Sequence, residues 1–145
     1  MHADPDLKPM PSYWIAFFWK LLVGRDVFAV SESSPLPVPI WMHGSVHCGR
    51  RSGVSHVAVL INFHMTSSAR VSVEHVGAKG NQSVTAFVLN GPVFSDRITV
   101  NNVPLALRED GSLPMPKGVS VADGVVELPP HSIAFVELAG ERMCK

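Results

Sequence analysis

The segment PSYWIAFFWKLLVG, residues 11–24, has apolar residues at helical spacing, and the rest of the chain does not. Its large apolar residues recur every four positions on two adjacent lines of a helix, Tyr13, Phe17, Leu21 and Trp14, Phe18, Leu22. Ser12 is the expected N-cap and Gly24 the expected C′ residue, which predicts a helix over residues 12–23. Ile15 and Trp19 occupy the remaining faces, so we expect this helix to be buried on two sides.

After Gly24 the period of the apolar residues changes to two. Short segments bounded by Gly, Pro, Ser or Asn predict strands over residues 27–30, 38–46, 56–63, 70–76, 84–89, 97–100, 103–107, 119–128 and 132–138. Asn101-Asn102 predicts a two-residue hairpin turn, because Asn tolerates a positive φ. The expected fold is mainly β, an antiparallel β-sandwich with one N-terminal α-helix.

The composition excludes several classes of protein. The 145 residues are 46% hydrophobic and 17% charged, which excludes a disordered chain. The 12 Lys and Arg balance the 12 Asp and Glu, so the basic surface of a nucleic-acid-binding protein is not expected. The longest apolar stretch, residues 13–23, is about half of what a membrane-spanning helix needs. Acid and proline in the first six residues do not resemble a signal peptide.

Histidines near a cysteine raise the question of a metal site. His43 and His47 would share one face of a strand, whereas Cys48 would point to the other face, which does not build a closed zinc site. His56 and His64 would also share a face, but about 27 Å apart along an extended strand. We therefore expect no metal and no cofactor.

The carboxylates do not form a promising acid–base pair. Glu109-Asp110 precedes Gly111 in a predicted loop, where a solvated turn is the better interpretation. Three other glutamates alternate with apolar neighbours on predicted strands and are expected to face outward: Glu74, Glu127 and Glu137.

Cys48 allows two interpretations. As a nucleophile it would need a base, and its neighbour His47 should point to the opposite face. The favoured interpretation is a disulfide from Cys48 to Cys144, which would stabilise the fold by roughly 4–5 kcal/mol in an oxidising compartment. Asn81-Gln82-Ser83 matches a glycosylation sequon and makes Asn81 a possible glycosylation site.

Residues 11–24 resemble the P-x-Y-(Y/W)-x-x-x-L-(W/F)-x-x-L-(M/V)-G segment of glycoside hydrolase family 79, the heparanases and heparanase-like β-glucuronidases. Later segments are similar to motifs of the same family in the same order. They are VHC (46–48), VAVLINF (57–63), ITVNNVPLAL (98–107, with Asn102 in place of Gly), LPMP (113–116) and PHSIAFV (130–136) followed by a terminal Cys. The resemblance extends from about residue 9 to residue 144.

This resemblance implies that the helix is the last one of a truncated β/α barrel. Residues 1–24 would be the remnant of that barrel, and residues 25–145 would be the C-terminal β-sandwich domain. Five helix residues would pack against the barrel: Tyr13, Trp14, Phe17, Phe18 and Leu21. The family also pairs the cysteine of its His-Cys motif with the terminal cysteine, which matches Cys48 and Cys144.

The family members are retaining glycosidases, and both of their catalytic glutamates lie on barrel strands upstream of this helix. No catalytic residue is therefore expected here, and the sandwich would have a stabilising role beside a missing barrel domain, in the same chain or a separate one. The resemblance implies an extracellular, lysosomal, vacuolar or membrane-associated protein. The alternative is a stand-alone sandwich that binds glycans or proteins without hydrolase activity.

Overall fold

The computed structural model describes residues 9–30, 42–73, 82–92 and 96–141. Helix α1 (Pro11–Leu22) comes first, and strands make up most of the remaining regular structure. The chain is mainly β, with antiparallel sheets and an N-terminal helix, as predicted. The strands are β1 (Val23–Phe28), β2 (Met42–Gly49), β3 (Val54–Asn62), β4 (Ala69–Ser72), β5 (Val84–Asn90), β6 (Thr99–Val100), β7 (Val103–Pro104), β8 (Val119–Val121), β9 (Val125–Leu128) and β10 (Ser132–Ala139), with the 3-10 helix η1 (Ala122–Gly124) between β8 and β9.

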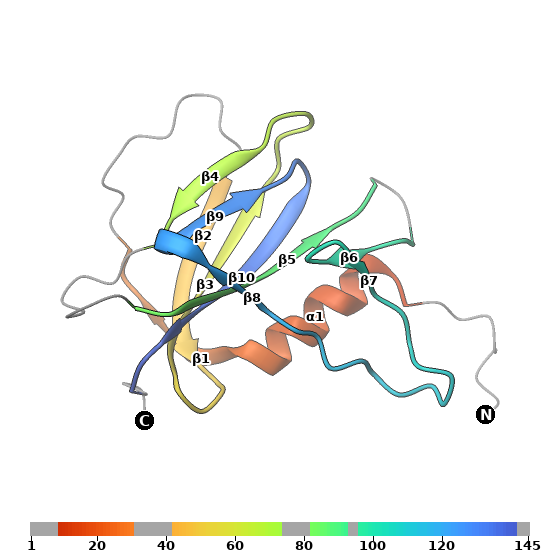
Figure 1. Ribbon diagram of the computed structural model, residues 1–145, viewed down its shortest axis with the longest axis horizontal. Helices are drawn as coiled ribbons and strands as arrows, with labels where there is room; N and C mark the ends of the chain where they lie inside the picture. Colours follow the sequence, from red (N-terminus) through yellow and green to blue (C-terminus); the bar gives the residue numbers. More distant parts are fainter. Residues whose placement is uncertain (1–8, 31–41, 74–81, 93–95, 142–145) are drawn as a thin grey trace.

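Two antiparallel sheets organise these strands (Figure 1). The large sheet has the order β1-β2-β3-β10-β5-β6-β7, and β8 also pairs with β5. The small sheet consists of β4 and β9. At the centre of the large sheet, β3 and β10 pair from Ser132 opposite Asn62 to Ala139 opposite Val54. Segments that are about 75 residues apart in sequence therefore form the middle of the domain.

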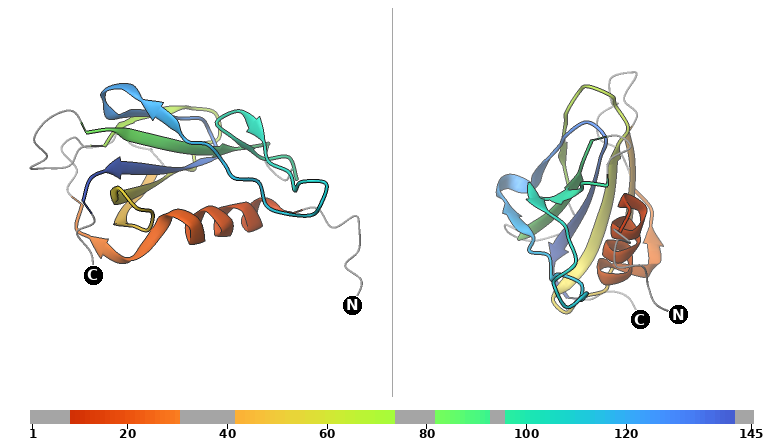
Figure 2. Two further views of the ribbon diagram at one scale, coloured as in Figure 1. Left: turned by 60° about the horizontal axis from the view of Figure 1, so that its bottom comes forward. Right: turned by 90° about the vertical axis from the view of Figure 1, so that its right-hand side faces the viewer.

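The large sheet is buried on both faces, because α1 covers one face and the small sheet covers the other (Figure 2). Side chains alternate between the two cores along β10. Phe135 belongs to the helix-side core, with Trp14, Phe18, Leu22, Val23, Val54, Val57, Val59, Phe87, Leu89, Ile98 and Val100. Ala134, Val136 and Leu138 belong to the opposite core, with Ala58, Leu60, Val84, Ala86, Val126 and Leu128.

Both predicted ends of α1 were wrong. The N-cap is Met10 rather than Ser12, because Pro11 occupies the first helical position, where its missing N–H breaks no hydrogen bond. Gly24 is not a left-handed C′ residue, since Val23 is already extended and both residues belong to β1. A Cβ on Gly24 would lie 2.7 Å from the carbonyl oxygen of Cys48. Glycine is needed here for the close approach of β1 to β2.

The hairpin prediction was confirmed, whereas the strand predicted over residues 119–128 needs correction, and the strands predicted over 27–30 and 103–107 have other bounds, Val23–Phe28 and Val103–Pro104. Asn101 and Asn102 have φ values of 48° and 65° and connect β6 to β7. The predicted strand over residues 119–128 is divided at Asp123 and Gly124, whose φ values are 55° and 65°. At this point the chain leaves the large sheet, where β8 pairs with β5, and enters the small sheet as β9.

Candidate functional site

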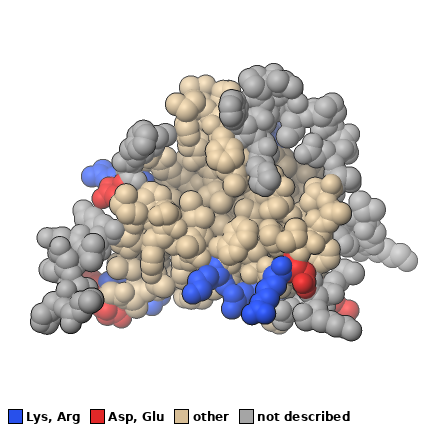
Figure 3. Space-filling model, turned by 180° about the vertical axis from the view of Figure 1, so that it is seen from behind, with Lys and Arg blue, Asp and Glu red and all other residues tan. Residues whose placement is uncertain are grey.

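Helix α1 has an inner face in the core and an outer face that is largely uncovered. Trp14, Phe18 and Leu22 are at most 1% exposed, whereas Tyr13 is 46% and Trp19 is 42% exposed. Figure 3 shows this side of the molecule, where uncharged side chains cover most of the surface and Lys and Arg gather along the lower edge. Among the described residues only the inner face of the helix is covered, so burial of α1 on a second side stays a prediction that depends on another domain.

The predicted set of barrel-packing residues is divided between these faces. Phe18 stacks on Phe135 at 5.8 Å between ring centroids and contacts the edge of Phe87 at 5.8 Å. Trp14 is also fully buried, so neither Trp14 nor Phe18 is free to contact another domain. The remaining members of the set are the exposed Tyr13 and two residues packed only partly against the core, Phe17 and Leu21.

Beneath the C-terminal end of α1, a row of residues crosses four neighbouring strands. His47 on β2 is opposite Val57 on β3, Val57 is opposite Glu137 on β10, and Glu137 is opposite Thr85 on β5. Directly opposite residues share one face of an antiparallel sheet, and Val57 belongs to the helix-side core. His47 and Glu137 are therefore two ionisable residues on the same face of the large sheet, on strands separated by about 10 Å.

His47 is held between α1 and the sheet. It is 7% exposed, and its Nε2 is 3.0 Å from the Ser45 hydroxyl oxygen. The Trp19 ring contacts it edge-on, at 5.1 Å between centroids. Burial lowers the pKa of His47 below its usual 6.5, because the charged imidazolium would lose its hydration. The folded protein therefore favours neutral His47.

Glu137 corrects a prediction, because it is 4% exposed rather than facing outward. Its Oε1 lies 3.4 Å from Nε of Arg51, in the turn between β2 and β3, and makes no hydrogen bond. The guanidinium of Arg51 lies over the Phe87 ring, 5.8 Å from its centroid. Burial raises the pKa of Glu137 above its usual 4.5, while the charge of Arg51 opposes this shift.

The sequence contains a signal for the buried Glu137 that the prediction did not use. Along β10 the apolar residues occupy both alternating sets of positions: Ile133 and Phe135 on one face, and Ala134, Val136 and Leu138 on the other. A strand with this pattern is covered on both sides. A charged residue within it is then expected to be buried and paired with a residue of opposite charge.

The other carboxylates that were expected to face solvent do so where the structure describes them. Glu109, Asp110 and Glu127 are exposed. Asp110 Oδ1 accepts a hydrogen bond from the Ser112 backbone N–H at 2.9 Å, and bonding by Ser112 lowers the pKa of the Asp110 carboxyl. Glu74 lies outside the described residues.

Cys48 is 2% exposed on β2, opposite His56 on β3. Since His47 is opposite Val57 instead, adjacent residues of β2 point to different faces, as the sequence suggested. Cys144 and Asn81 both lie outside the described residues. The disulfide and the glycosylation site therefore stay predictions.

The structure describes most of the histidines that raised the question of a metal site. Among the described residues, no group of three His, Cys, Asp or Glu side chains could hold a metal ion. His64 holds the turn that follows it, because its Nδ1 accepts hydrogen bonds from the backbone N–H groups of Thr66 at 3.2 Å and Ser67 at 2.9 Å. Buried Asn62 extends this network by donating to the carbonyl oxygens of Ser67 and Leu128. The side chain of His43 is outside the described part of the structure.

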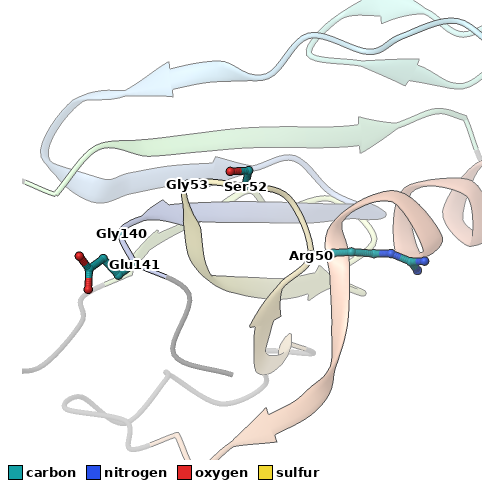
Figure 4. A pocket seen from close by; sticks show the side chains of 5 residues that line it. All are labelled: Arg50, Ser52, Gly53, Gly140 and Glu141. Carbon is teal, nitrogen blue, oxygen red and sulfur yellow. The ribbon is translucent and has the colours of Figure 1, made fainter. Parts of the chain in front are cut away.

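A shallow, open hollow lies where the β2–β3 turn meets the end of β10. Its lining residues are Arg50, Ser52, Gly53, Gly140 and Glu141. In Figure 4 the side chains of Arg50, Ser52 and Glu141 point in three different directions, with Arg50 directed toward α1. The hollow therefore has no converging set of polar groups that would suit catalysis.

No protein-family model matches the chain. In the described residues, no helix is long and apolar enough to span a membrane. The chain is 24% identical over 150 aligned residues to inactive heparanase-2 of Homo sapiens and of Mus musculus. These alignments cover 92% of this chain but only 25% of the relatives, so the chain spans about a quarter of their length.

Solved structures with a similar arrangement are also parts of glycoside hydrolases. An arabinofuranosidase has a TM-score of 0.43 and 15% identity, over 68% of this chain and 19% of that chain. A Paenibacillus polymyxa xyloglucanase of glycoside hydrolase family 44 has a TM-score of 0.40 and 14% identity, over 68% and 17%. At these scores the structural likeness carries no functional argument. The sequence similarity supports a glycosidase-like relationship for this chain.

Proposed function

We propose that this chain is the C-terminal part of a heparanase-like protein of glycoside hydrolase family 79. In this proposal the β-sandwich stabilises a β/α-barrel domain that is encoded elsewhere, in the same protein or as a separate chain. The proposed whole protein acts on glucuronides or heparan-type glycans, in an extracellular, lysosomal, vacuolar or membrane-associated setting. The catalytic glutamates of such an enzyme would belong to the barrel, so we expect this chain to be inactive alone.

The observation that carries the proposal is the uncovered outer face of α1. Tyr13 and Trp19 remain about half exposed although the opposite face of the same helix is completely buried. Val27 extends the apolar surface beside Trp19, because it is 64% exposed and is opposite His47, which Trp19 contacts. Apolar surfaces of this kind favour contact with another domain. We name the exposed side of α1 and β1 the outer face; it carries Tyr13, Trp19 and Val27, with Ser12, Ala16 and Lys20 between Tyr13 and Trp19 on the helix.

The coverage of the relatives supports the same proposal. A chain that aligns with a quarter of a longer protein corresponds to one part of that protein, and the remaining three quarters are available to cover the outer face. The relatives are named inactive heparanase-2, so the similarity alone does not indicate hydrolysis even for a whole protein. A stabilising role is the function that fits both the similarity and the outer face.

Two assays on the purified chain test the proposal against a stand-alone glycan-binding module. We expect no hydrolysis of an aryl glucuronide and, by calorimetry, no binding of a glucuronic-acid-containing oligosaccharide. Binding without hydrolysis would favour the stand-alone module instead. Hydrolysis by the chain alone would refute the assignment of the catalytic groups to another domain.

A further inference from the structure

The loop between β3 and β4, residues 63–68, lies beside the β9–β10 turn (Figure 1). Within this loop, the Nδ1 atom of His64 accepts hydrogen bonds from two backbone N–H groups, Thr66 at 3.2 Å and Ser67 at 2.9 Å. The loop leads into β4, which begins at Ala69 and belongs to the small sheet. His64 therefore fixes the backbone at the entry to the small sheet.

Two other turns in the chain show which residue types ordinarily make such contacts. Asp110 Oδ1 accepts a hydrogen bond from the Ser112 N–H at 2.9 Å, and Asn62 Oδ1 accepts one from the His64 N–H at 3.0 Å. In both, a side-chain oxygen of Asp or Asn holds the backbone two residues further on, which is an Asx turn. Nδ1 of histidine is bonded to Cγ, as Oδ1 is in asparagine. His64 therefore holds the N–H of Thr66 in the same way, but with an acceptor that can be protonated.

The two hydrogen bonds require a neutral His64. A neutral imidazole has one ring nitrogen that accepts, and the contacts need this to be Nδ1, with the proton on Nε2. An imidazolium carries a proton on both nitrogens, so no orientation of its ring offers an acceptor to Thr66 and Ser67. Histidine is the side chain whose charge ordinarily changes between about pH 5 and pH 8. The bonds are therefore present on the neutral side of this range and are lost on its acidic side.

A second contact to the same loop does not titrate. Asn62 is 1% exposed, and its Nδ2 donates to the carbonyl oxygens of Ser67 at 3.0 Å, Leu128 at 3.1 Å and Pro129 at 3.0 Å. The N–H of Ser67 thus depends on His64, whereas its carbonyl oxygen depends on Asn62. Protonation of His64 would release one side of the loop and leave the contact to the β9–β10 turn in place.

The neighbouring elements bring other titratable or charged groups to this end of the sheet. In the β9–β10 turn, the backbone N–H of His131 donates to the carbonyl oxygen of His64 at 3.3 Å. Arg70 on β4 and Glu127 on β9 are exposed and lie opposite each other. On β2, the side chain of His43 is outside the described part of the structure. His131 is the neighbour that can gain charge over the same pH range as His64, so the test needs a control for it.

We propose that His64 is a proton-sensitive latch, which holds the β3–β4 loop and the start of β4 at neutral pH and releases them on acidification. Ala69 and Val71 of β4 pack against the core between the two sheets, so release of the loop would loosen one end of the small sheet over that core. The latch itself does not depend on the proposed function. In the lysosomal or vacuolar setting of that proposal, it would be open.

The test compares amide exchange of Thr66 and Ser67 at pH 7 and pH 5 in the wild type, His64→Asn and His64→Ala. Exchange is expressed as protection factors, which remove the intrinsic pH dependence of the chemistry. In the wild type we expect protection to fall severalfold at pH 5, because the two hydrogen bonds are lost. His64→Asn supplies Oδ1 in place of Nδ1 and cannot be protonated, so protection should stay high at both pH values. His64→Ala has no acceptor, so protection should be low at both.

Two variants of neighbouring residues serve as controls. His131→Asn removes the other histidine while tolerating its φ of 52°, and Glu127→Gln removes the exposed carboxylate of β9. Both should keep the wild-type pH response of Thr66 and Ser67. The proposal is overturned if His64→Asn responds to pH as the wild type does, or if His131→Asn abolishes the response.

A second measurement uses the wild type alone, and so does not depend on how the variants fold. Nitrogen-15 NMR of the imidazole at neutral pH should show the proton of His64 on Nε2 and an unprotonated Nδ1. On acidification, the amide resonances of Thr66 and Ser67 should shift in the same step as the His64 ring. A neutral His64 with its proton on Nδ1, or amides that do not follow its titration, would contradict the proposal.

Discussion

Phe18→Ala is expected to destabilise the isolated chain by about 3–5 kcal/mol, which is the range for removing a fully buried aromatic side chain. Phe18 is 0% exposed and contacts two rings from different strands, Phe87 on β5 and Phe135 on β10. Removing it would leave a cavity between α1 and the centre of the large sheet. The measurement is urea unfolding followed by circular dichroism, at one low protein concentration so that self-association does not contribute.

Tyr13→Ala is the matched control for this loss. Tyr13 lies on the same helix and is also aromatic, but it is 46% exposed, so we expect a change of about 0.5–1 kcal/mol or less. If both variants lose similar stability, α1 is not an integral layer of this domain. The sandwich would then fold without a stabilising contribution from the helix.

Cys48→Ser and Cys144→Ser are each expected to cost about 4–5 kcal/mol under oxidising conditions, from the entropy of the long loop that a disulfide between them would close. The double variant should lose no more than either single variant, because both changes remove the same bond. Unfolding with and without a reductant provides an independent comparison. The wild type should lose a similar amount of stability on reduction.

A loss in Cys48→Ser with no loss in Cys144→Ser would contradict this pairing. A large loss in Cys48→Ser alone would be explained by the burial of Cys48 on β2, where it is 2% exposed. In that case the reductant would leave the wild type unchanged. Equal losses that do not add would support a bond that fastens the C-terminal tail to β2.

The sequence predicts the β content, the position of α1 and the Asn101-Asn102 hairpin, because local spacing and the tolerance of Asn for positive φ determine these features. It could not show which line of apolar residues on α1 would be covered. Both lines, with Phe17 on one and Phe18 on the other, are equally apolar, and the choice depends on where β5 and β10 pass beneath the helix.

The pairing of Arg51 with Glu137 is a tertiary feature of the same kind. The two residues are 86 positions apart in sequence, and the turn between β2 and β3 brings them to 3.4 Å. The alternation pattern could have indicated that Glu137 is buried, but nothing local identifies its partner. By contrast, Asp123-Gly124 is a local turn signal that could have located the change of sheet between β8 and β9, which the predicted strand over residues 119–128 missed.

Helix α1 belongs to this domain on its inner face, and we propose that another domain covers its outer face. Deleting residues 1–24 cannot test it, because the deletion would also remove Trp14, Phe18 and Leu22 from the core. Surface substitutions preserve that core. Tyr13→Lys with Val27→Lys changes the outer face, and Phe63→Lys with Met65→Lys changes two exposed apolar residues elsewhere as a control.

Sedimentation equilibrium of these three proteins over a range of concentrations is the most direct measurement. The wild type and the Phe63/Met65 control should both self-associate as the concentration rises, because the uncovered outer face favours apolar contact. The Tyr13/Val27 variant should remain monomeric with an unchanged circular dichroism spectrum. A wild type that is monomeric at every concentration would contradict the claim that the outer face requires a covering domain.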